Sequence, residues 1–90
     1  MAQYMVIEHF RGGNAVPVYT RFRAQGRLAP EGLEYVTSWV TEDLTTCYQI
    51  MACDDRALLG QWIANWSDLV TFEVHRVITS AEASARVPVA

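Results

Sequence analysis

The sequence places a carboxylate and an imidazole side by side at the end of its first apolar run, YMVIEHF at residues 4–10. Glutamate and histidine often move protons in enzymes, so Glu8 and His9 are the first candidates for chemistry. Adjacent residues of a regular strand point to opposite faces, however, and the two side chains then cannot share a site. Only a bulge near Gly12 and Gly13 would turn one toward the other. We therefore do not expect a Glu8–His9 dyad.

A second histidine offers Glu8 a different partner. His75 lies in the last strand-like run, TFEVHRVI at residues 71–78, and it can meet Glu8 if the first and last runs form neighbouring strands. Burial raises the pKa of a carboxyl group and imidazole titrates near neutrality, so the pair would suit acid–base catalysis. The alternative is a hydrated subunit interface in which both groups are hydrogen-bonded. His9, the third catalytic candidate, is better explained as a hydrogen-bonded structural histidine.

The spacing of the cysteines argues against disulfide and metal chemistry. Cys47 and Cys53 lie six residues apart in one predicted strand, and roughly 20 Å separates them at ~3.3 Å per residue. That distance is too long for a disulfide. Two cysteines and two histidines without ligand spacing do not predict a zinc site. We expect neither a metal nor a cofactor.

The composition is that of a single globular domain. The 90 residues are 51% hydrophobic and 19% charged, which is enough for a modest core. The net charge of −3 disfavours nucleic-acid binding, which needs a basic surface. No signal-like segment is present, and no apolar run approaches the roughly 18 residues of a membrane span. We expect a cytoplasmic protein without nucleic-acid or membrane partners.

Arginines concentrate in the first third of the chain. Residues 1–30 contain Arg11, Arg21, Arg23 and Arg27 against a single carboxylate, Glu8. Such a pattern favours a solvated, arginine-rich helix face. The sharper alternative is an anion site or a complementary contact between subunits.

Hydrophobic periodicity predicts six elements in the order strand, helix, strand, strand, helix, strand. The strands are expected at residues 3–10, 33–41, 45–53 and 71–78, and the helices at residues 15–27 and from residue 54. Asn14 is expected to cap the first helix, with Pro17 in its first turn, and Asp54 and Asp55 to start the second. Residues 1–80 then form the domain, and residues 81–90 a tail that is either mobile or laid on a partner subunit.

This order predicts an α+β fold, the ferredoxin-like βαββαβ sandwich, in which a four-stranded antiparallel sheet carries both helices on one face. Helix-facing positions are expected to be aliphatic, which assigns Met5, Ile7, Val36, Val40, Ile50 and Ala52 to that side, with Phe72 and Val74. The open face then receives Tyr4, Val6, Glu8, Phe10, Tyr35, Thr37, Trp39, Cys47, Gln49, Met51, Glu73 and His75. Because exposed aromatic patches mark binding surfaces, two such sheets are expected to face each other in a homodimer.

Six stretches stand out as a set: YMVIEHF, AVPVYTRFR with the following GR, PEGLEYVTSWV, CYQIM with the acidic DD, LLGQWIANWSDLV, and FEV with ITSAEA. Through them, over residues 3–83, the chain resembles a bacterial family of domains of unknown function, numbered thirty-three-oh-three, in the dimeric α/β-barrel superfamily. The resemblance implies the sandwich and the face-to-face dimer but no reaction. Relatives typically continue FEV with a hydrophobic residue where this chain has His75, which favours Glu8 and His9 as family-level candidates. More distant relatives include metal- and flavin-free monooxygenases, muconolactone isomerase-like, dehalogenase-like and stress-responsive proteins.

Two functions from different classes fit these features. The first is binding of a small hydrophobic or aromatic metabolite in the cavity on the open face, with monooxygenase- or isomerase-like chemistry and no cofactor. Its ligand-binding candidates are Tyr4, Tyr35, Trp39, Gln49 and Met51. The second is a non-enzymatic dimeric module, structural or regulatory, whose closed interface is filled by its own aromatic side chains.

Overall fold

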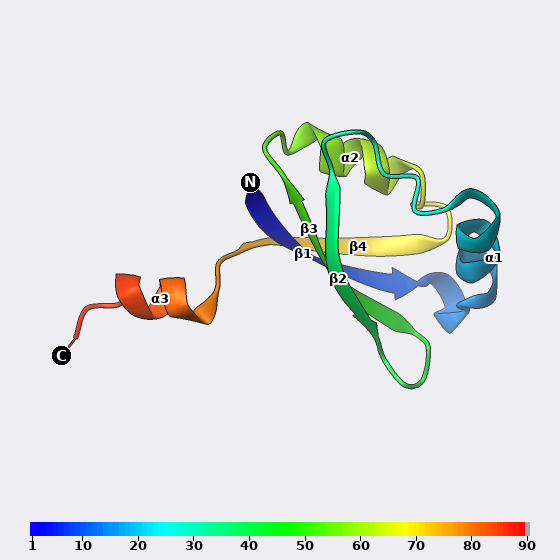
Figure 1. The fold of residues 1–90 in the computed structure, drawn as a ribbon. Helices are drawn as coiled ribbons and strands as arrows, with labels where there is room; N and C mark the ends of the chain where they lie inside the picture. The colour runs from blue at the N-terminus through cyan, green and yellow to red at the C-terminus, as the bar shows by residue number, and fades with distance from the viewer. Residues whose placement is uncertain (90) are drawn as a thin grey trace.

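The predicted order of elements is confirmed in the computed structural model, which describes residues 1–89 (Figure 1). The strands are β1 (Ala2–Phe10), β2 (Glu34–Val40), β3 (Thr46–Cys53) and β4 (Val70–Val77), and the helices are α1 (Val16–Gln25), α2 (Ala57–Ala64) and α3 (Ser80–Arg86). A short 3-10 turn, η1 (Arg11–Gly13), joins β1 to α1. The strands form one antiparallel sheet in the order β2-β3-β1-β4, as in a ferredoxin-like sandwich.

Two of the side chains predicted to start the helices accept hydrogen bonds from their first turns. The Val16 amide donates to Asn14 Oδ1 at 3.0 Å, and the Ala57 amide donates to Asp55 Oδ1 at 2.9 Å. Pro17 occupies the first turn of α1, where a missing amide donor costs no helical hydrogen bond. Within residues 1–89, no helix is long and apolar enough to cross a membrane.

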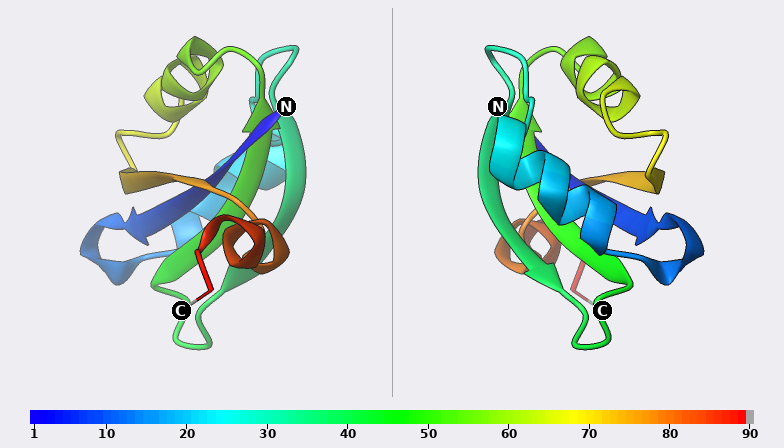
Figure 2. Two further views of the ribbon diagram at one scale, coloured as in Figure 1. Left: turned by 90° about the vertical axis from the view of Figure 1, so that its left-hand side faces the viewer. Right: turned by 90° about the vertical axis from the view of Figure 1, so that its right-hand side faces the viewer.

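The core lies between the sheet and α1 and α2, which both pack on one face (Figure 2). β1 and β3 supply alternating side chains, Val18 comes from α1, and Leu59 and Trp62 come from α2. Phe72 and Val74 of β4 pack against this cluster, as predicted. The opposite face of the sheet has no cover within the described residues.

The predicted assignment of faces is wrong for β1 and β3. The buried residues facing the helices are Tyr4, Val6, Glu8 and Phe10 in β1 and Cys47, Gln49 and Met51 in β3. Met5, Ile7 and Ile50, expected on the helix side, lie on the open face and are partly exposed. Ala52 is opposite Gln3 and therefore also belongs to that face, although it is buried. Of the predicted aliphatic set in these strands and β2, only Val40 packs against the core.

The reason for the reversal lies in the helices, whose inner faces carry aromatic rings beside the aliphatic Val18 and Leu59. Tyr19 meets Phe10 edge to face with ring centroids 6.4 Å apart, and Trp62 meets Phe72 at 6.1 Å. Aromatic pairs favour such edge contacts beyond the area that they bury. The face of β1 that carries its aromatic residues therefore packs against the helices. The expectation of an aliphatic inner face assigned the opposite face to that position.

A bulge in β2 changes the parity of that strand. The register with β3 shifts between Tyr35 and Thr37, so that Val36 has no opposite residue and is 46% exposed. Tyr35 is opposite Met51 and turns to the helix side, against the prediction, whereas Thr37 and Trp39 lie on the open face as predicted. An extra residue in one strand has this effect because side chains alternate with a period of two.

The C-terminal segment contains a third helix, which was not expected from the sequence. α3 projects away from the sheet and the other helices in Figure 1, and none of its residues is buried. Thr79 Oγ1 accepts a hydrogen bond from the Glu82 amide at 3.1 Å. The spacing of Thr79 and Glu82 is that of a capping box, a signal present in the sequence.

Candidate functional site

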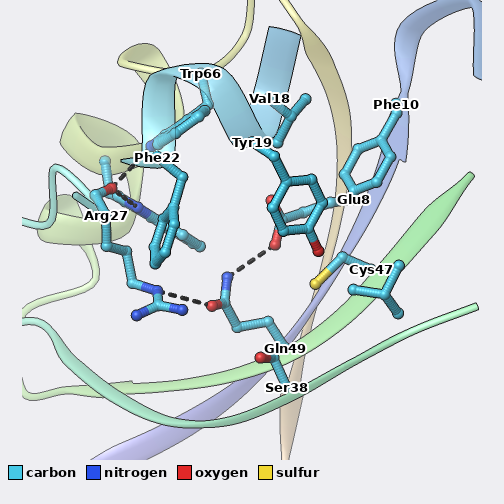
Figure 3. A pocket seen from close by; sticks show the side chains of 12 residues that line it. Glu8, Phe10, Val18, Tyr19, Phe22, Arg27, Ser38, Cys47, Gln49 and Trp66 are labelled. Carbon is cyan, nitrogen blue, oxygen red and sulfur yellow. Dashed lines mark hydrogen bonds between the residues drawn. The ribbon is translucent and has the colours of Figure 1, made fainter. Parts of the chain in front are cut away.

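A cavity of about 280 Å³ lies between the sheet and the helices (Figure 3). The side chains that line it come from the strands and from the helices with their flanking turns: Glu8, Phe10, Ser38, Val40, Cys47 and Gln49 on one side, and Val18, Tyr19, Phe22, Arg27, Trp62 and Trp66 on the other. Most of the wall is aromatic or aliphatic. A mainly apolar cavity with a few converging polar groups is typical of small-molecule sites, and its volume is near the lower end of their usual range of about 300–1,000 Å³.

The polar side chains form one chain of hydrogen bonds along the floor of the cavity (Figure 3). Arg27 Nε donates to Gln49 Oε1 at 3.0 Å, and Gln49 Nε2 donates to Glu8 Oε2 at 2.8 Å. The guanidinium group can only donate, so it fixes the amide oxygen toward Arg27 and the amide nitrogen toward Glu8. When Glu8 is protonated, its proton is then carried by Oε1.

Burial gives Glu8 an unusual acidity. The side chain is 7% exposed, and loss of hydration raises the pKa of the carboxyl group from 4.5 to about 7. The Cys47 thiol, the charge of Arg27 and the amide of Gln49 stabilise the carboxylate and offset part of that rise. A carboxyl group with a pKa near neutrality can both accept and return a proton at physiological pH.

Cys47 lies opposite Glu8 in the neighbouring strand. Burial, together with the nearby charge of Glu8, raises the pKa of its thiol to about 12. The reactive form of cysteine is the thiolate. Cys47 therefore stays a neutral thiol at the pH at which Glu8 titrates and is not a nucleophile.

Arg27 is held in place through its main chain. Its carbonyl oxygen accepts two indole hydrogen bonds, from Trp62 Nε1 at 3.0 Å and Trp66 Nε1 at 2.9 Å. Asn65 Nδ2 donates to the next carbonyl, that of Leu28, at 3.0 Å. Three side chains of α2 and the turn after it thus fix the loop that positions Arg27 in the cavity wall.

The other arginines of the first third have structural or surface positions. Arg21 makes a two-pronged contact with Asp68, at 2.8 Å and 2.6 Å, and Arg11 donates twice to the Ser67 carbonyl. Both hold the turn that follows α2. Arg23 is exposed on α1. The expected solvated face thus describes Arg23 but not Arg27.

The structure separates the predicted catalytic candidates. Glu8 is opposite Phe72, whereas His75 is opposite Met5, which places the two on different faces of the sheet. His75 is exposed, with Nε2 3.2 Å from Glu73 Oε1. A Glu8–His75 pair on one face is therefore wrong. His9 is exposed near the end of β1 and makes no side-chain hydrogen bond within residues 1–89, so the expectation of a hydrogen-bonded structural histidine is wrong. Glu8 and His9 lie on opposite faces of the sheet, as expected.

Of the predicted ligand-binding residues, only Gln49 lines the cavity. Tyr4 and Met51 are buried in the core, and Trp39 is 63% exposed on the opposite face. Tyr35 stands beside the site, where its ring stacks on Arg27. Five further lining residues, from the helices and the turn after α2, were not predicted from the sequence: Val18, Tyr19, Phe22, Trp62 and Trp66.

No group of three or more histidine, cysteine, aspartate or glutamate side chains converges anywhere in residues 1–89. Among the side chains that line the cavity, Glu8 is the one suited to proton transfer.

Comparison with known proteins gives a family and no activity. The chain has no significant match among curated proteins and none among solved structures. One family model matches nearly its whole length, residues 2–89. The chain belongs to the family described as Domain of unknown function (DUF3303).

Proposed function

We propose that the protein binds a small apolar or aromatic metabolite in the cavity between sheet and helices, and that Glu8 transfers a proton on that ligand. The observation that carries the proposal is a buried carboxyl group, with a pKa of about 7, in the wall of an aromatic cavity. Strongly perturbed titratable groups in concave sites are candidates for function. The helix-side cavity takes the place of the open-face cavity expected from the sequence.

The simplest reaction of this kind is isomerase-like. Protonated Glu8 would give its proton to one atom of the ligand and take one back from another, so that no electrons are lost and no cofactor is consumed. The rings of Tyr19, Phe22 and Trp66 would hold the ligand by apolar contact and keep water away from the carboxyl group. The resemblance to dimeric α/β-barrel enzymes supports a reaction of this type. In a monooxygenase-like variant, ionised Glu8 would remove a proton from a CH2 group of the ligand, and the resulting carbanion would reduce dioxygen, so that one oxygen atom forms a carbonyl group and the other leaves as water.

We also propose that the open face of the sheet pairs with a second copy of the chain. Trp39 is 63% and Tyr48 39% exposed on that face, and they are cross-strand neighbours. Exposed contiguous apolar surface of this kind favours an interface. Because the cavity is on the other face, dimerisation would leave it intact.

The ligand proposal can be tested through the three tryptophans. Trp62 and Trp66 line the cavity, whereas Trp39 is on the opposite face. In a screen of small aromatic compounds, observed by NMR, binding in the cavity should shift the two cavity indole signals and leave that of Trp39 in place. A non-enzymatic module with no ligand would show no such shifts.

A pair of variants on α1 controls the screen. Val18→Phe places a larger side chain at a buried position in the cavity wall, and Val16→Phe makes the same change at a position that is 70% exposed. The first should abolish the shifts and the second preserve them. Once a substrate is found, Glu8→Gln should bind it and lose turnover by about 100-fold or more, the range of general acid–base catalysis. Undiminished turnover would remove Glu8 from the reaction.

A further inference from the structure

We propose that the ligand of the cavity is an aromatic or apolar carboxylate, whose anionic group Arg27 binds, and that it enters together with a proton on Glu8. This inference rests on the proposed function, since it names the chemical class that the same cavity would take. It starts from Arg27, a residue that the proton chemistry of Glu8 does not itself require.

Both the main chain and the guanidinium group of Arg27 are held by contacts that a solvated arginine lacks. Two indole N–H groups converge on its carbonyl oxygen, which uses both lone pairs of that atom. The guanidinium carbon lies 3.7 Å from the centroid of the Tyr35 ring and 5.2 Å from that of Phe22. Stacking on aromatic rings restricts the plane of the group as well as its position.

No carboxylate in the described part of the chain lies within ion-pair distance of this fixed group. Within residues 1–89, Arg27 donates one side-chain hydrogen bond, from Nε to the neutral amide of Gln49, and forms no ion pair. Arg21, by contrast, is saturated by the carboxylate of Asp68. The terminal nitrogens of Arg27 are therefore free to make the paired hydrogen bonds that an arginine fork offers a carboxylate.

Arg27 stands where such a ligand would enter. It is partly exposed, as is Phe22, and both line the cavity. Figure 3 shows Arg27 on one side of the lining and Val18 and Tyr19 on the other. The carboxylate of the ligand would stay at Arg27, and its apolar body would extend toward Val18 and Tyr19. The cavity volume of about 280 Å³ suits one or two fused rings rather than a long chain.

The charges of Arg27, Glu8 and a bound carboxylate depend on one another. Gln49 connects Arg27 to Glu8, so a bound carboxylate would share a cavity of low polarity with Glu8. Two carboxylates close together disfavour each other's ionised form. With Glu8 protonated, Arg27 and the ligand balance each other. With Glu8 ionised, the site carries an excess negative charge and binds the ligand less well.

No other group in the cavity titrates in the relevant range. Glu8 is faced by Tyr19 of α1, Cys47 of β3 and Arg27 from the loop before β2, while α2 and the following turn contribute only tryptophans and β4 contributes Phe72. Burial raises the pKa of Tyr19 above its usual value of 10, and Cys47 is a thiol below pH 12. Any dependence of binding on pH near neutrality is therefore assigned to Glu8, whose pKa is about 7.

The test compares acids with their neutral amides on the full chain: benzoate with benzamide, and naphthoate with naphthamide, titrated while the indole signals are observed. The acids should bind wild-type protein at least about tenfold more tightly than the amides at about pH 6, as expected for a charge-assisted pair. Arg27→Met should remove this preference, and Arg27→Lys, which lacks the fork, should keep only part of it. The matched control Arg23→Met, an exposed arginine on α1, should keep all of it.

A pH series tests the proton. Affinity for the acids should fall by about tenfold between about pH 6 and about pH 8, because the protonated fraction of Glu8 falls by that factor. In Glu8→Gln the acids should bind equally well at both values. Equal affinity for acid and amide, or an acid preference that survives in Arg27→Met, would overturn the inference while amide-induced shifts of the Trp62 and Trp66 signals still supported the cavity. Failure of all four probes to shift those signals would overturn the proposed function and this inference with it.

Discussion

At the scale of single residues, Glu8 occupies a position that an apolar side chain would fill at lower free energy. Its neighbours on the same face of β1 are Val6 and Phe10, both buried. A buried carboxyl group must either find strong partners or hold its proton. Glu8 has only a neutral amide and a thiol beside it, with Arg27 one residue further away. It therefore keeps a titratable proton in the cavity at neutral pH.

This arrangement predicts how stability depends on pH. The pKa of Glu8 is about 7 in the folded protein and has its ordinary value of 4.5 in the unfolded chain. Between these values the unfolded chain binds fewer protons than the folded one, so the free energy of unfolding falls as pH rises and levels off above about 7. The difference between the two pKa values corresponds to a loss of about 3 kcal/mol in the free energy of unfolding, at about 1.4 kcal/mol per pKa unit.

Glu8→Gln should remove that loss, because the amide stays neutral and can still accept from Gln49. Urea unfolding at about pH 5 and about pH 8 measures both proteins. From about pH 5 to about pH 8, the free energy of unfolding of the variant should rise by roughly 2–3 kcal/mol relative to that of wild type. Parallel pH profiles for the two proteins would show that Glu8 ionises normally in the folded state.

At the scale of elements, pattern and propensity in the sequence were sufficient for the order, the type and the approximate bounds of six elements. Alternation and caps are local signals, and Asn14 and Asp55 act where they were expected. The faces of β1 and β3 could not be obtained in this way, because both parities are rich in apolar residues. The choice depends on how Tyr19, Phe22 and the tryptophans of the helices fill space, which is a tertiary property.

The remaining misses in the site also arise from non-local structure. The bulge at Val36 places Tyr35 on the opposite face of β2 from Trp39. No residue type in β2 predicts this bulge. Arg27 reaches the cavity because Trp62, Trp66 and Asn65 hold its loop, contacts that span more than thirty residues of sequence. Glu8 was identified from the sequence, and Cys47 and Gln49 were placed on its face, but Arg27 was not assigned to the site.

α3 provides a prediction at the same scale. Helices of this length are unstable alone, and α3 has no buried residue to anchor it. Its helical state should therefore depend on the Thr79 cap. Thr79→Ala, which removes the acceptor for the Glu82 amide, should cost α3 about 0.5–2 kcal/mol and lower the helical Cα chemical shifts over residues 80–86. The urea midpoint of the sandwich should not change. Full helical shifts in the variant would mean that other contacts hold α3.

At the scale of the whole molecule, the two faces of the sheet have different compositions and, on our proposals, different tasks. The helix side holds the aromatic cavity with Glu8 and Arg27. The open side presents Trp39 and Tyr48 to solvent, next to the partly exposed Met5, Ile7 and Ile50. Ligand binding and self-association would then use separate surfaces, so that either can be removed without the other.

That separation predicts the outcome of a charge placed on the open face. Wild-type protein should have a solution mass of twice 10.2 kDa by light scattering over a dilution series, because burying each large aromatic contributes on the order of 2–4 kcal/mol. Trp39→Lys should shift the equilibrium to the monomer, since a lysine pair would lie in the apolar interface. Val16→Lys, at an equally exposed apolar residue of α1, should remain a dimer.

The monomeric variant should still bind cavity ligands through Trp62 and Trp66. A wild-type monomer at all concentrations would mean that the open face serves a different partner, and loss of ligand binding in Trp39→Lys would mean that the two faces are coupled.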